Sequence, residues 1–598
     1  MQLTFWDWLI IAAYLLFALA VAVIYVRRAS RGMDEFFVSG RSLPWWLLGT
    51  SMVATTFSTD TPNLITNLVR ENGVAYNWIW WSFLVTGMLT VFFYARLWRR
   101  SKVLTDLEFY EIRYSGKSAA IVRGFRALYL GLFFNCVIMA TVTLAAAKIA
   151  NILFGWTRLE TVLYGSVAAI LFSVLSGLWG VVVTDLIQFL MAMTGAIAAA
   201  YFSLQQDAVG GLDGLVSRLD KSTLNLFPDF GNWELTLIIF IVPLTIQWWS
   251  VWYPGAEPGG GSFIAQRMLA AKDEKHSFAA TLWFNVAHYS VRPWPWLLVG
   301  LCSILVYPTL QDIQRAFPHV SPHLIGHDMA YPAMLIFLPA GFKGIMVASL
   351  AAAYLSTMDT SLNWGASYLV HDFYRRFIKP EASQKHYVLI SRVVTTALMI
   401  LAALLMFLLV SARESFELLL SIGAGTGLIY ILRWFWWRIN AWSEIAAMIS
   451  SFLIALSFFI LRKGGTDVPA HVVLIVSVAA TTIIWILVTF ATRPTDFKTL
   501  SSFYRLIRPF GRGWLPIREK LDIGPSPDSF AHSLLGWILG CLLVYSALFG
   551  MGNLLYGKLN LAVICAVPFL ISGVGLTWLI RHMLKSEKDM NSDEKKTL

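Results

Sequence analysis

Apolar windows of about 20 residues recur along nearly the whole chain. A helix needs about 20 such residues to cross the hydrocarbon core of a bilayer, so each window predicts a membrane span. The fifth and sixth spans meet at a very short turn near Gly180. We expect an all-α polytopic membrane protein with about fifteen spans, at residues 6–27, 44–70, 76–97, 124–154, 160–180, 181–204, 235–255, 279–308, 343–370, 388–411, 415–433, 440–461, 470–492, 532–552 and 558–582.

Composition agrees with this class of protein. Hydrophobic residues make up 57% of the 598 residues and charged residues only 14%, far from the balance of a soluble protein. The first apolar window has no cationic region before it, so we expect a retained span rather than a signal peptide. The net charge of +11 does not indicate nucleic-acid binding, because Lys and Arg gather in alternate loops. The four cysteines lack metal-type spacing.

The distribution of Lys and Arg predicts the orientation in the membrane. Loops after odd-numbered spans carry the cations, and the loop at 205–234 is net acidic. By the positive-inside rule the N-terminus lies outside and the C-terminus in the cytoplasm, with the chain in the plasma membrane, or inner membrane of a bacterium. The basic and aromatic loop 493–531 is expected in the lipid headgroup region, with a regulatory docking site as the alternative. The charged tail 583–598 is expected to be irregular. The cations counted include Arg27, Arg28, Arg31, Arg41, Arg267, Lys272 and Lys275.

Two spans carry residues that interrupt a membrane helix. The stretch 44–63 is apolar as far as Ala54 and then turns polar, with hydroxyl residues, Asp60 and Pro62. Such groups are costly in hydrocarbon and mark a cavity or ion path, although hydroxyls bonded back to their own kinked helix are the alternative. The second interruption, 246–261, holds two prolines, four glycines and Glu257. The breaks lie five spans apart, in spans two and seven, so they predict two repeats of inverted topology.

Other polar residues lie in the predicted spans. In span nine a small-residue face carries Ala353, Ser356, Thr357 and Thr360, with Asp359 beside it. Hydroxyl oxygens suit a small cation, whereas helix packing alone does not explain Asp359. Asp185 opens span six, where capping is the simpler explanation. Arg292 lies inside span eight, and either pairs with a carboxylate such as Glu257 or contacts substrate.

Several motifs resemble those of the sodium:solute symporter family, which includes sodium-coupled sugar, proline and sialic-acid transporters. The resemblance covers about residues 6–462 and rests on 36–46, 183–188, 266–272 and 355–363 followed by Asp372-Phe-Tyr-Arg-Arg376. It implies a leucine-transporter-like fold, with 5+5 core helices, an extra N-terminal helix and further C-terminal helices. It also implies a primary sodium site made by the carbonyls of Ala54, Phe57 and Ala353 and the hydroxyls of Ser356 and Thr357.

Some family members bind a second sodium, which here would use Asp185, Ser356, Asp359 and Thr360. The extra carboxylate of Asp359 departs from the family pattern, so we expect a stronger second cation site, or a proton site if one acid stays protonated. The positions that hold sugar in sugar-transporting members are Thr61, Asn77 and Trp80 here, which puts familiar sugar transport in doubt. We expect a small polar solute, with an anionic solute as one version, near Thr61, Asn77, Trp80, Trp248, Glu257 and Arg292.

These expectations define a division of the chain and a function. The segments are the N-terminal helix and first loop 1–43, a first repeat 44–204, an external loop 205–234, a second repeat 235–433, two helices in 434–492, the loop 493–531, two helices in 532–582 and the tail 583–598. The function expected is sodium-coupled symport of the solute into the cell, with partners limited to solute, sodium and lipid. A proton-coupled symporter and a transporter-like solute sensor are the alternatives. We expect no enzyme, because His288 is isolated and we find no nucleophile–base or metal cluster in the sequence.

Overall fold

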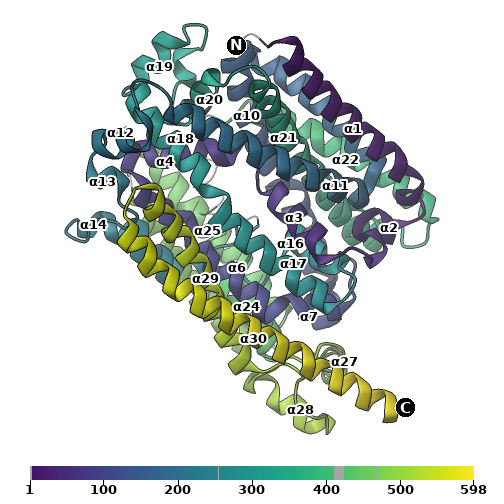
Figure 1. Cartoon of the computed structure of the whole chain (residues 1–598). Helices are drawn as coiled ribbons and strands as arrows, with labels where there is room; N and C mark the ends of the chain where they lie inside the picture. Colours follow the sequence, from purple (N-terminus) through teal and green to yellow (C-terminus); the bar gives the residue numbers. More distant parts are fainter. Residues whose placement is uncertain (1–2, 254, 410–419, 421–422, 467, 598) are drawn as a thin grey trace.

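The structure, a computed structural model, describes residues 3–253, 255–409, 420, 423–466 and 468–597, with side chains for all of these but 174–176, 323, 463 and 584–597. Regular structure within this part of the chain is helical, apart from two isolated β-bridges. The chain begins with α1 (Phe5–Ala29), which lies on the outside of the bundle (Figure 1).

The first half of the bundle follows α1. Its principal helices are α2 (Met33–Val38), α3 (Trp45–Thr55), α4 (Asp60–Asn72), α5 (Trp78–Trp81), α6 (Phe83–Leu89), the π-helical η3 (Thr90–Tyr94), α7 (Ala95–Ser101), α8 (Phe109–Arg113), α9 (Gly116–Leu128), η4 (Tyr129–Phe134), α10 (Asn135–Phe154) and α11 (Arg158–Leu204). The segment that follows α11 holds the short helices α12 (Gly211–Arg218) and α13 (Lys221–Leu224).

The second half of the bundle consists of a further long series of helices. Its elements are α14 (Trp233–Thr236), η5 (Leu237–Ile241), η6 (Pro243–Gln247), α15 (Trp248–Ser250), α16 (Ser262–Ala270), α17 (Glu274–Val286), η7 (Ala287–Val291), α18 (Pro293–Val306), α19 (Leu310–Ala316), α20 (Ala330–Met334), α21 (Phe342–Ser367), η11 (Tyr368–Ile378), α22 (Gln384–Met406) and α24 (Gly427–Phe435). The chain ends with α25 (Ala441–Lys463), α26 (Ala470–Ala491), α27 (Phe497–Ile507), α28 (Leu515–Leu521), α29 (Phe530–Leu555) and α30 (Leu559–Thr597).

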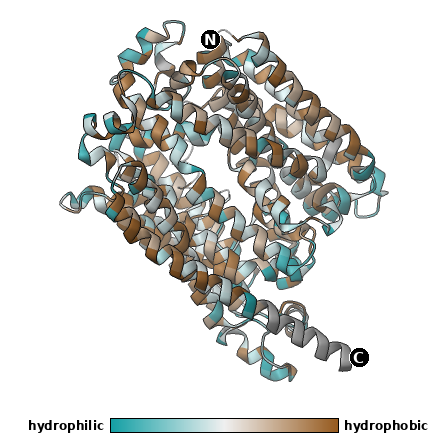
Figure 2. Ribbon diagram, in the orientation of Figure 1, coloured by the Kyte–Doolittle hydropathy of each residue, from teal (hydrophilic) through white to brown (hydrophobic). Residues whose placement is uncertain are grey.

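Among the described residues, 12 helical segments are long and apolar enough to cross a membrane. They match twelve of the expected spans, and the other three differ for identifiable reasons. The span at 44–70 is divided into α3 and α4, the span at 160–180 forms the first part of α11, and the span at 415–433 lies partly outside the described residues. Figure 2 shows apolar residues along the outward faces of α1 and α30, as lipid exposure requires.

The reversal between the fifth and sixth spans occurs at Gly177 rather than Gly180. Gly177 has φ 55° and ψ −166°, a conformation that is essentially confined to glycine. Before it, Ser173 bonds Asp359 of α21, and after it Asp185 bonds Ser356 and Gly195 faces Ser349. The two parts of α11 therefore run in opposite directions along α21. Glycine is required at this turn also for space, because a Cβ at residue 177 would lie 3.0 Å from the backbone oxygen of Phe36.

Both predicted breaks are present. Residues 56–59 interrupt the first helix between α3 and α4, and residues 251–261 separate α15 from α16. The second break is paired with the segment that precedes α24: Trp252 N donates to Gly423 O at 3.2 Å, and Gly425 N donates to Ser250 O at 2.9 Å. These bonds satisfy backbone groups that a helix would otherwise satisfy, as burial requires.

The basic residues assigned to cytoplasmic loops are partly buried in the protein. Arg113 donates to the carbonyls of Arg433 and Trp436, each at 2.9 Å, and Arg267 is fully buried in α16. Counting Arg267 as a loop charge was therefore wrong, since α16 is the helical continuation of a broken span. The predicted orientation does not depend on this one residue.

The loop 493–531 packs several of its aromatic side chains against the bundle, and its expected place among lipid headgroups stays a prediction. Phe503, Tyr504 and Trp514 are each 1 to 2% exposed, and Trp514 Nε1 donates to Trp434 O at 2.7 Å. Their rings cover the end of the bundle near α8, because the aromatic and guanidinium groups of this region stack on one another, as Arg113 does over Trp514 at 4.8 Å. The tail, expected to be irregular, continues α30 as far as Thr597. Lys and Glu favour helix there.

The C-terminal pair α29 and α30 lies along one side of the bundle (Figure 1). Three ring donors join α29 to its neighbours: Trp537 Nε1 to Val85 O at 2.8 Å, Tyr545 OH to Trp81 O at 2.9 Å, and Trp294 Nε1 to Leu548 O at 2.8 Å. Gly536 and Gly540 permit this close approach, since a Cβ at Gly536 would lie 2.3 Å from the ring of Phe92. α29 is thus fixed to α5, α6 and α18.

Candidate functional site

The first break exposes backbone carbonyls, and two of them are bound by side chains from the second half of the chain. Thr357 Oγ1 in α21 donates to Thr55 O at 2.8 Å. Arg292 Nη1, at the start of α18, donates to Thr56 O at 2.5 Å and to Thr56 Oγ1 at 2.9 Å. The Ala54 carbonyl accepts from Phe57 N at 2.9 Å within the break itself. The break therefore faces the hydroxyl side of α21, as the sequence predicts.

This geometry brings the two helices of the predicted sodium site together. A hydroxyl that donates to a carbonyl across 2.8 Å can instead turn its oxygen toward a cation that both oxygens share. Ser356, one residue earlier, directs its hydroxyl to Asp185 Oδ1 at 2.6 Å. Thr357 and Ser356 thus lie in two adjacent but different polar environments.

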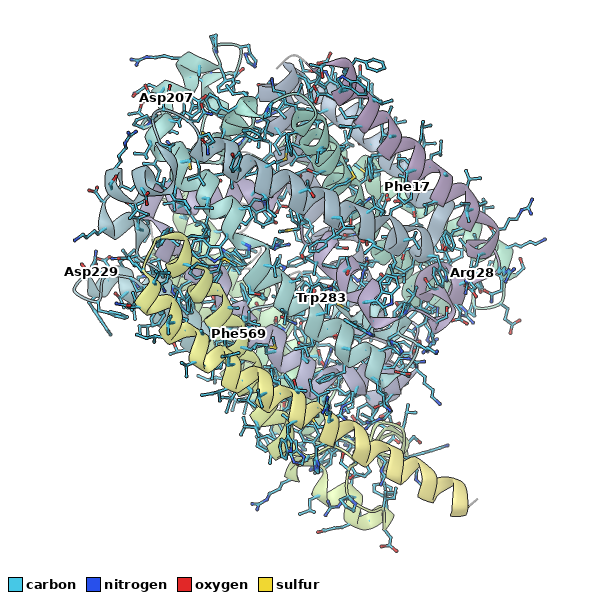
Figure 3. All side chains as sticks on the ribbon, in the orientation of Figure 1. Phe17, Arg28, Asp207, Asp229, Trp283 and Phe569 are labelled. Atoms are coloured by element: carbon cyan, nitrogen blue, oxygen red, sulfur yellow. The ribbon has the colours of Figure 1, made fainter. Side chains whose placement is uncertain are left out.

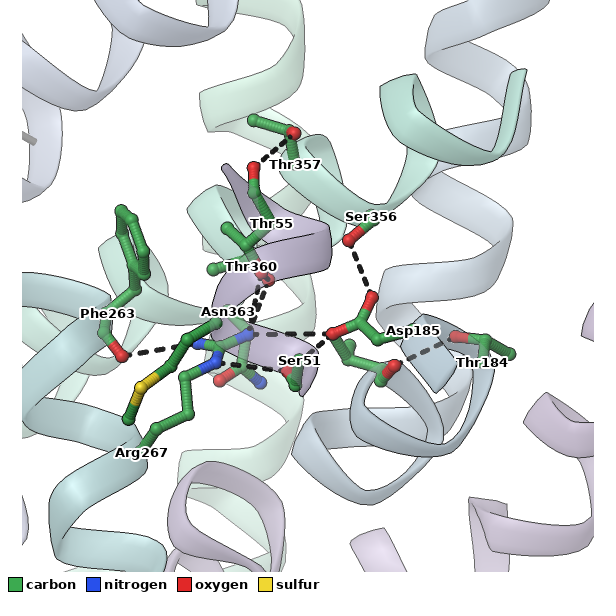
Figure 4. Close-up of polar contacts among 12 residues, drawn as sticks. Ser51, Thr55, Thr184, Asp185, Phe263, Arg267, Ser356, Thr357, Thr360 and Asn363 are labelled. Atoms are coloured by element: carbon green, nitrogen blue, oxygen red, sulfur yellow. Dashed lines mark hydrogen bonds and ion pairs between the residues drawn. The ribbon is translucent and has the colours of Figure 1, made fainter. Parts of the chain in front are cut away.

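A buried guanidinium occupies the neighbourhood of the predicted second cation site (Figure 4). Arg267 donates through Nε to Ser51 Oγ at 3.2 Å, and through Nη2 to Thr360 Oγ1 at 2.7 Å and Thr55 Oγ1 at 3.2 Å. The same Nη2 lies 4.0 Å from Asp185 Oδ2. Because both charged side chains have no exposed surface, this is a buried ion pair linked through hydroxyls.

Ser51 joins the acid to the base in this cluster. Its hydroxyl donates to Asp185 Oδ2 at 2.5 Å while its oxygen accepts from Arg267. Asp185 therefore has two hydroxyl donors, Ser51 and Ser356, and one nearby cation. The structure brings Asp185, Ser356 and Thr360 together, but with Arg267 among them.

Asp359, one helical turn after Ser356, faces α1 and α11. Its carboxylate accepts from Ser173 Oγ at 2.5 Å and lines a small cavity of about 10 Å³ between α1, α11 and α21. Tyr14 and Gln188 line the same cavity and bond each other at 2.7 Å. A space of this size is near the lower limit for one water molecule. Asp359 thus does not share ligands with Asp185, although the two negative charges interact.

A larger cavity of about 110 Å³ lies beside the first break. Of the six residues predicted to hold the solute, Thr61, Trp80 and Arg292 line it. Thr55 and Thr357 line it as well, so the predicted sodium site borders the cavity directly. The solute cavity and the hydroxyl face of α21 therefore share a wall.

Three predicted solute contacts lie elsewhere. Asn77 Oδ1 accepts a hydrogen bond from Trp80 Nε1 at 2.9 Å, so Asn77 orients the Trp80 ring without lining the cavity itself. Trp248 donates to Leu244 O at 2.9 Å and packs on Trp537. Glu257 accepts a hydrogen bond from Ser262 Oγ beyond the second break. None of the three lines the 110 Å³ cavity.

The structure decides one of the two alternatives for Arg292: Glu257 is not its partner, while contact with substrate stays a prediction. Its contacts are Thr56, His288 and the rings of Phe57 and Trp296, and Glu257 is not among them. His288, which sequence reasoning treated as isolated, connects Thr56 Oγ1 at 2.9 Å with Arg292 Nη2 at 3.2 Å. The spacing of His288 and Arg292, one helical turn apart, was the available signal.

Sequence reasoning also left out other groups of the cavity. Asp60, which had no assigned role, lines it from the first turn of α4. Aromatic side chains supply much of the remaining wall, among them Phe83, Tyr253, Phe263, Tyr289 and Trp364. Aromatic residues are frequent throughout this chain, so no local pattern distinguished these five.

Two interrupted helices, and a cavity at one break that aromatic rings and hydroxyls from both halves of the chain line, define a solute transporter of the inverted-repeat class. The chain belongs to the sodium:solute symporter family, whose model matches residues 36–451. Its coupling ion is accordingly sodium, and it is a transporter and not an enzyme.

Relatives extend over most of the chain. The sodium/glucose cotransporter of Vibrio parahaemolyticus is 25% identical over 475 residues, covering 76% of this chain and 85% of the relative. The human sodium/myo-inositol cotransporter 2 is 23% identical and covers 75% of this chain and 69% of its own length. A solved sodium-coupled sialic acid symporter, in a substrate-bound outward-open state, has a TM-score of 0.66 at 20% identity, covering 83% of this chain and 99% of that one. This likeness confirms the expected fold.

Proposed function

We propose that the chain carries a small polar organic solute into the cell together with sodium by alternating access. The observation that supports this most directly is the bond from Thr357 Oγ1 to Thr55 O, at the edge of the 110 Å³ cavity. A sodium ion taken up at this point joins α21 to the broken helix and changes the wall of the solute cavity at the same time. Occupancy of one site then favours occupancy of the other, as linkage requires.

The proposed primary sodium site comprises the carbonyls of Ala54, Phe57 and Ala353 and the hydroxyls of Ser356 and Thr357. For the solute we propose Thr61, Trp80 and Arg292, with Asn77 as a support for Trp80. The anionic version of the solute rests on Arg292, but both of its terminal nitrogens already bind Thr56 and His288. The proposed repeats are 44–204 and 235–433, with the N-terminus outside and the C-terminus in the cytoplasm.

A proton-coupled mode remains the second candidate, and Asp359 is the observation that favours it. This carboxylate is buried beside a cavity with space for about one water molecule. A proton or a second cation bound there would act on Asp185 through charge.

The test uses the purified full chain. Thr357→Val removes one oxygen and keeps the shape of the side chain. We expect the sodium concentration for half-maximal thermal stabilisation to rise about 10-fold or more, since a bond to a charged group contributes about 1.5–3 kcal/mol. Thr194→Val is the matched control, because Thr194 is exposed and bonds only Leu190 O of its own helix, at 2.9 Å.

Solutes that raise the melting temperature only with sodium are then tested for counterflow in proteoliposomes. Counterflow that requires sodium distinguishes a transporter from a solute sensor, which binds without transport, and net uptake driven by an inward sodium gradient shows symport. Equal sodium affinity in the parent and in Thr357→Val would contradict the proposed sodium site.

A further inference from the structure

The 110 Å³ cavity is lined by one carboxylate, Asp60, and by one guanidinium, Arg292, with the imidazole of His288 beside it, and the two charged groups differ in their hydrogen bonds. Arg292 is supplied with partners: Nη1 binds Thr56 twice and Nη2 binds His288, while Trp296 and Phe57 lie 5.0 and 5.8 Å from its carbon centre. All of these partners are groups of the protein itself. The Arg292 guanidinium therefore stabilises the backbone of the first break through Thr56. Nε is its one nitrogen without a hydrogen bond among the described residues.

The carboxylate of Asp60, unlike the terminal nitrogens of the Arg292 guanidinium, has an oxygen that lacks a hydrogen bond. Its Oδ1 is buried and has no hydrogen-bond partner of good geometry among the described residues, with the Ser58 hydroxyl and the Thr61 amide as its local donors. Asp60 and Arg292 line the same cavity and interact by charge, but the contacts of Arg292 do not include the carboxylate. A buried carboxylate oxygen without a donor is costly, so a ligand that supplies one gains affinity.

The walls around Asp60 favour a cation. Trp80 and Tyr289 stack on each other at 5.8 Å, and Phe83 and Tyr253 do so at 5.6 Å. All four line the cavity. Aromatic rings attract an ammonium group by their quadrupole, and a desolvated carboxylate attracts it by charge. A purely anionic solute would gain at most one free donor, Arg292 Nε, and would add a second negative charge near Asp60.

We infer that the transported solute carries a protonated amine, which Asp60 Oδ1 binds inside this cavity. The inference rests on the proposed function and specifies its substrate class. It includes simple amines and zwitterions; in a zwitterion, the acidic group has Arg292 Nε as its available donor. A neutral polyol such as a sugar supplies hydroxyl donors but no charge, and binds Asp60 more weakly.

The experiment compares matched probes on the purified full chain in sodium buffer. Each set differs at the amine: glucosamine against glucose, serine against glycerate, proline against tetrahydrofuran-2-carboxylate, and ethanolamine against ethylene glycol. We expect thermal stabilisation by at least one amine and not by its partner. Stabilisation by ethanolamine indicates a simple amine, whereas stabilisation by serine or proline alone indicates a zwitterion.

The variants test the role of Asp60. Asp60→Asn is expected to weaken the amine between about 10-fold and about 150-fold, the loss typical of a bond to a charged group. Asp60→Glu keeps the charge and should keep the preference. Asp207→Asn is the matched control, since Asp207 is exposed between α11 and α12 (Figure 3) and does not line the cavity.

The outcomes separate this inference from the proposed function. Binding of only neutral or anionic members, binding of no amine in the panel, or an amine affinity unchanged in Asp60→Asn overturns the inference. If sodium does not stabilise the parent protein against heat, the proposed function is overturned instead. Sodium stabilisation in Asp60→Asn equal to that of the parent shows that the variant folds, so a lost amine response then supports the inference.

Discussion

Replacing Arg267 by Met tests whether a fixed side-chain charge stands in for a second cation. The substitution keeps an unbranched apolar stem and removes the guanidinium that binds Ser51, Thr55 and Thr360. Asp185 keeps its two hydroxyl donors but loses the cation 4.0 Å away. Breaking a buried pair in this way typically costs about 3–5 kcal/mol, because the remaining charge is uncompensated.

The expected result for Arg267→Met is therefore a decrease of about 3–5 kcal/mol in the free energy of unfolding, measured in sodium-free buffer. Sodium should restore part of it, since a small cation can then enter beside Asp185; at 100 times its Kd an ion adds about 2.7 kcal/mol. The assay is thermal and denaturant unfolding of the purified protein, titrated with sodium against choline.

Two further variants complete the cycle. Asp185→Asn combined with Arg267→Met removes both charges, so it should be more stable than Arg267→Met alone and should lose the additional sodium response. Arg315→Met is the surface control: Arg315 pairs with Asp312 at 3.4 Å but its side chain is 80% exposed, so the change should cost less than about 1 kcal/mol. If the double variant is as unstable as Arg267→Met, the two charges are not coupled and the reasoning is refuted.

Two other substitutions have defined outcomes. Asp359→Ser should change the pH dependence of transport or its sodium stoichiometry, measured in proteoliposomes; if both stay as in the parent, Asp359 holds neither a proton nor a cation. Gly177→Ala should cost about 1–3 kcal/mol of unfolding free energy, because alanine at φ 55° is strained and its Cβ would meet Phe36 O at 3.0 Å. Gly464→Ala, at φ −77° with its nearest atom at 3.4 Å, should change stability little, and equal losses in both would contradict the assigned role of Gly177.

Local chemistry made the two breaks predictable. Proline fits best in the first turn of a helix, so Pro62 predicts a helix that starts just before it, and the prolines and glycines of 246–261 together disfavour a continuous helix. The hydroxyls of α21 share a face by spacing alone. The family resemblance, and not local chemistry, placed Thr357 opposite the first break, and the bond to Thr55 O agrees with it.

Other residues depend on which helices meet. Arg267 follows a glycine-rich segment and precedes Lys272, so it reads as a loop charge, yet α16 buries it completely. Glu257 and Trp248 are near the second break in the chain but do not line the cavity, although Tyr253, Gly255 and Ala256 of the same break do. Contacts between helices far apart in the sequence decide whether these side chains are buried or line the cavity, and a local sequence pattern does not specify those contacts.

The bonds of α29 have a consequence for the transport cycle. Trp537 and Tyr545 fix α29 to α6 and α5, and Trp294 fixes it to α18. If those helices rock relative to α21 during transport, the C-terminal pair moves with them as part of one rigid body. The lipids around α29 and α30 must then rearrange in every cycle, so turnover should depend on bilayer viscosity and thickness on that side of the protein.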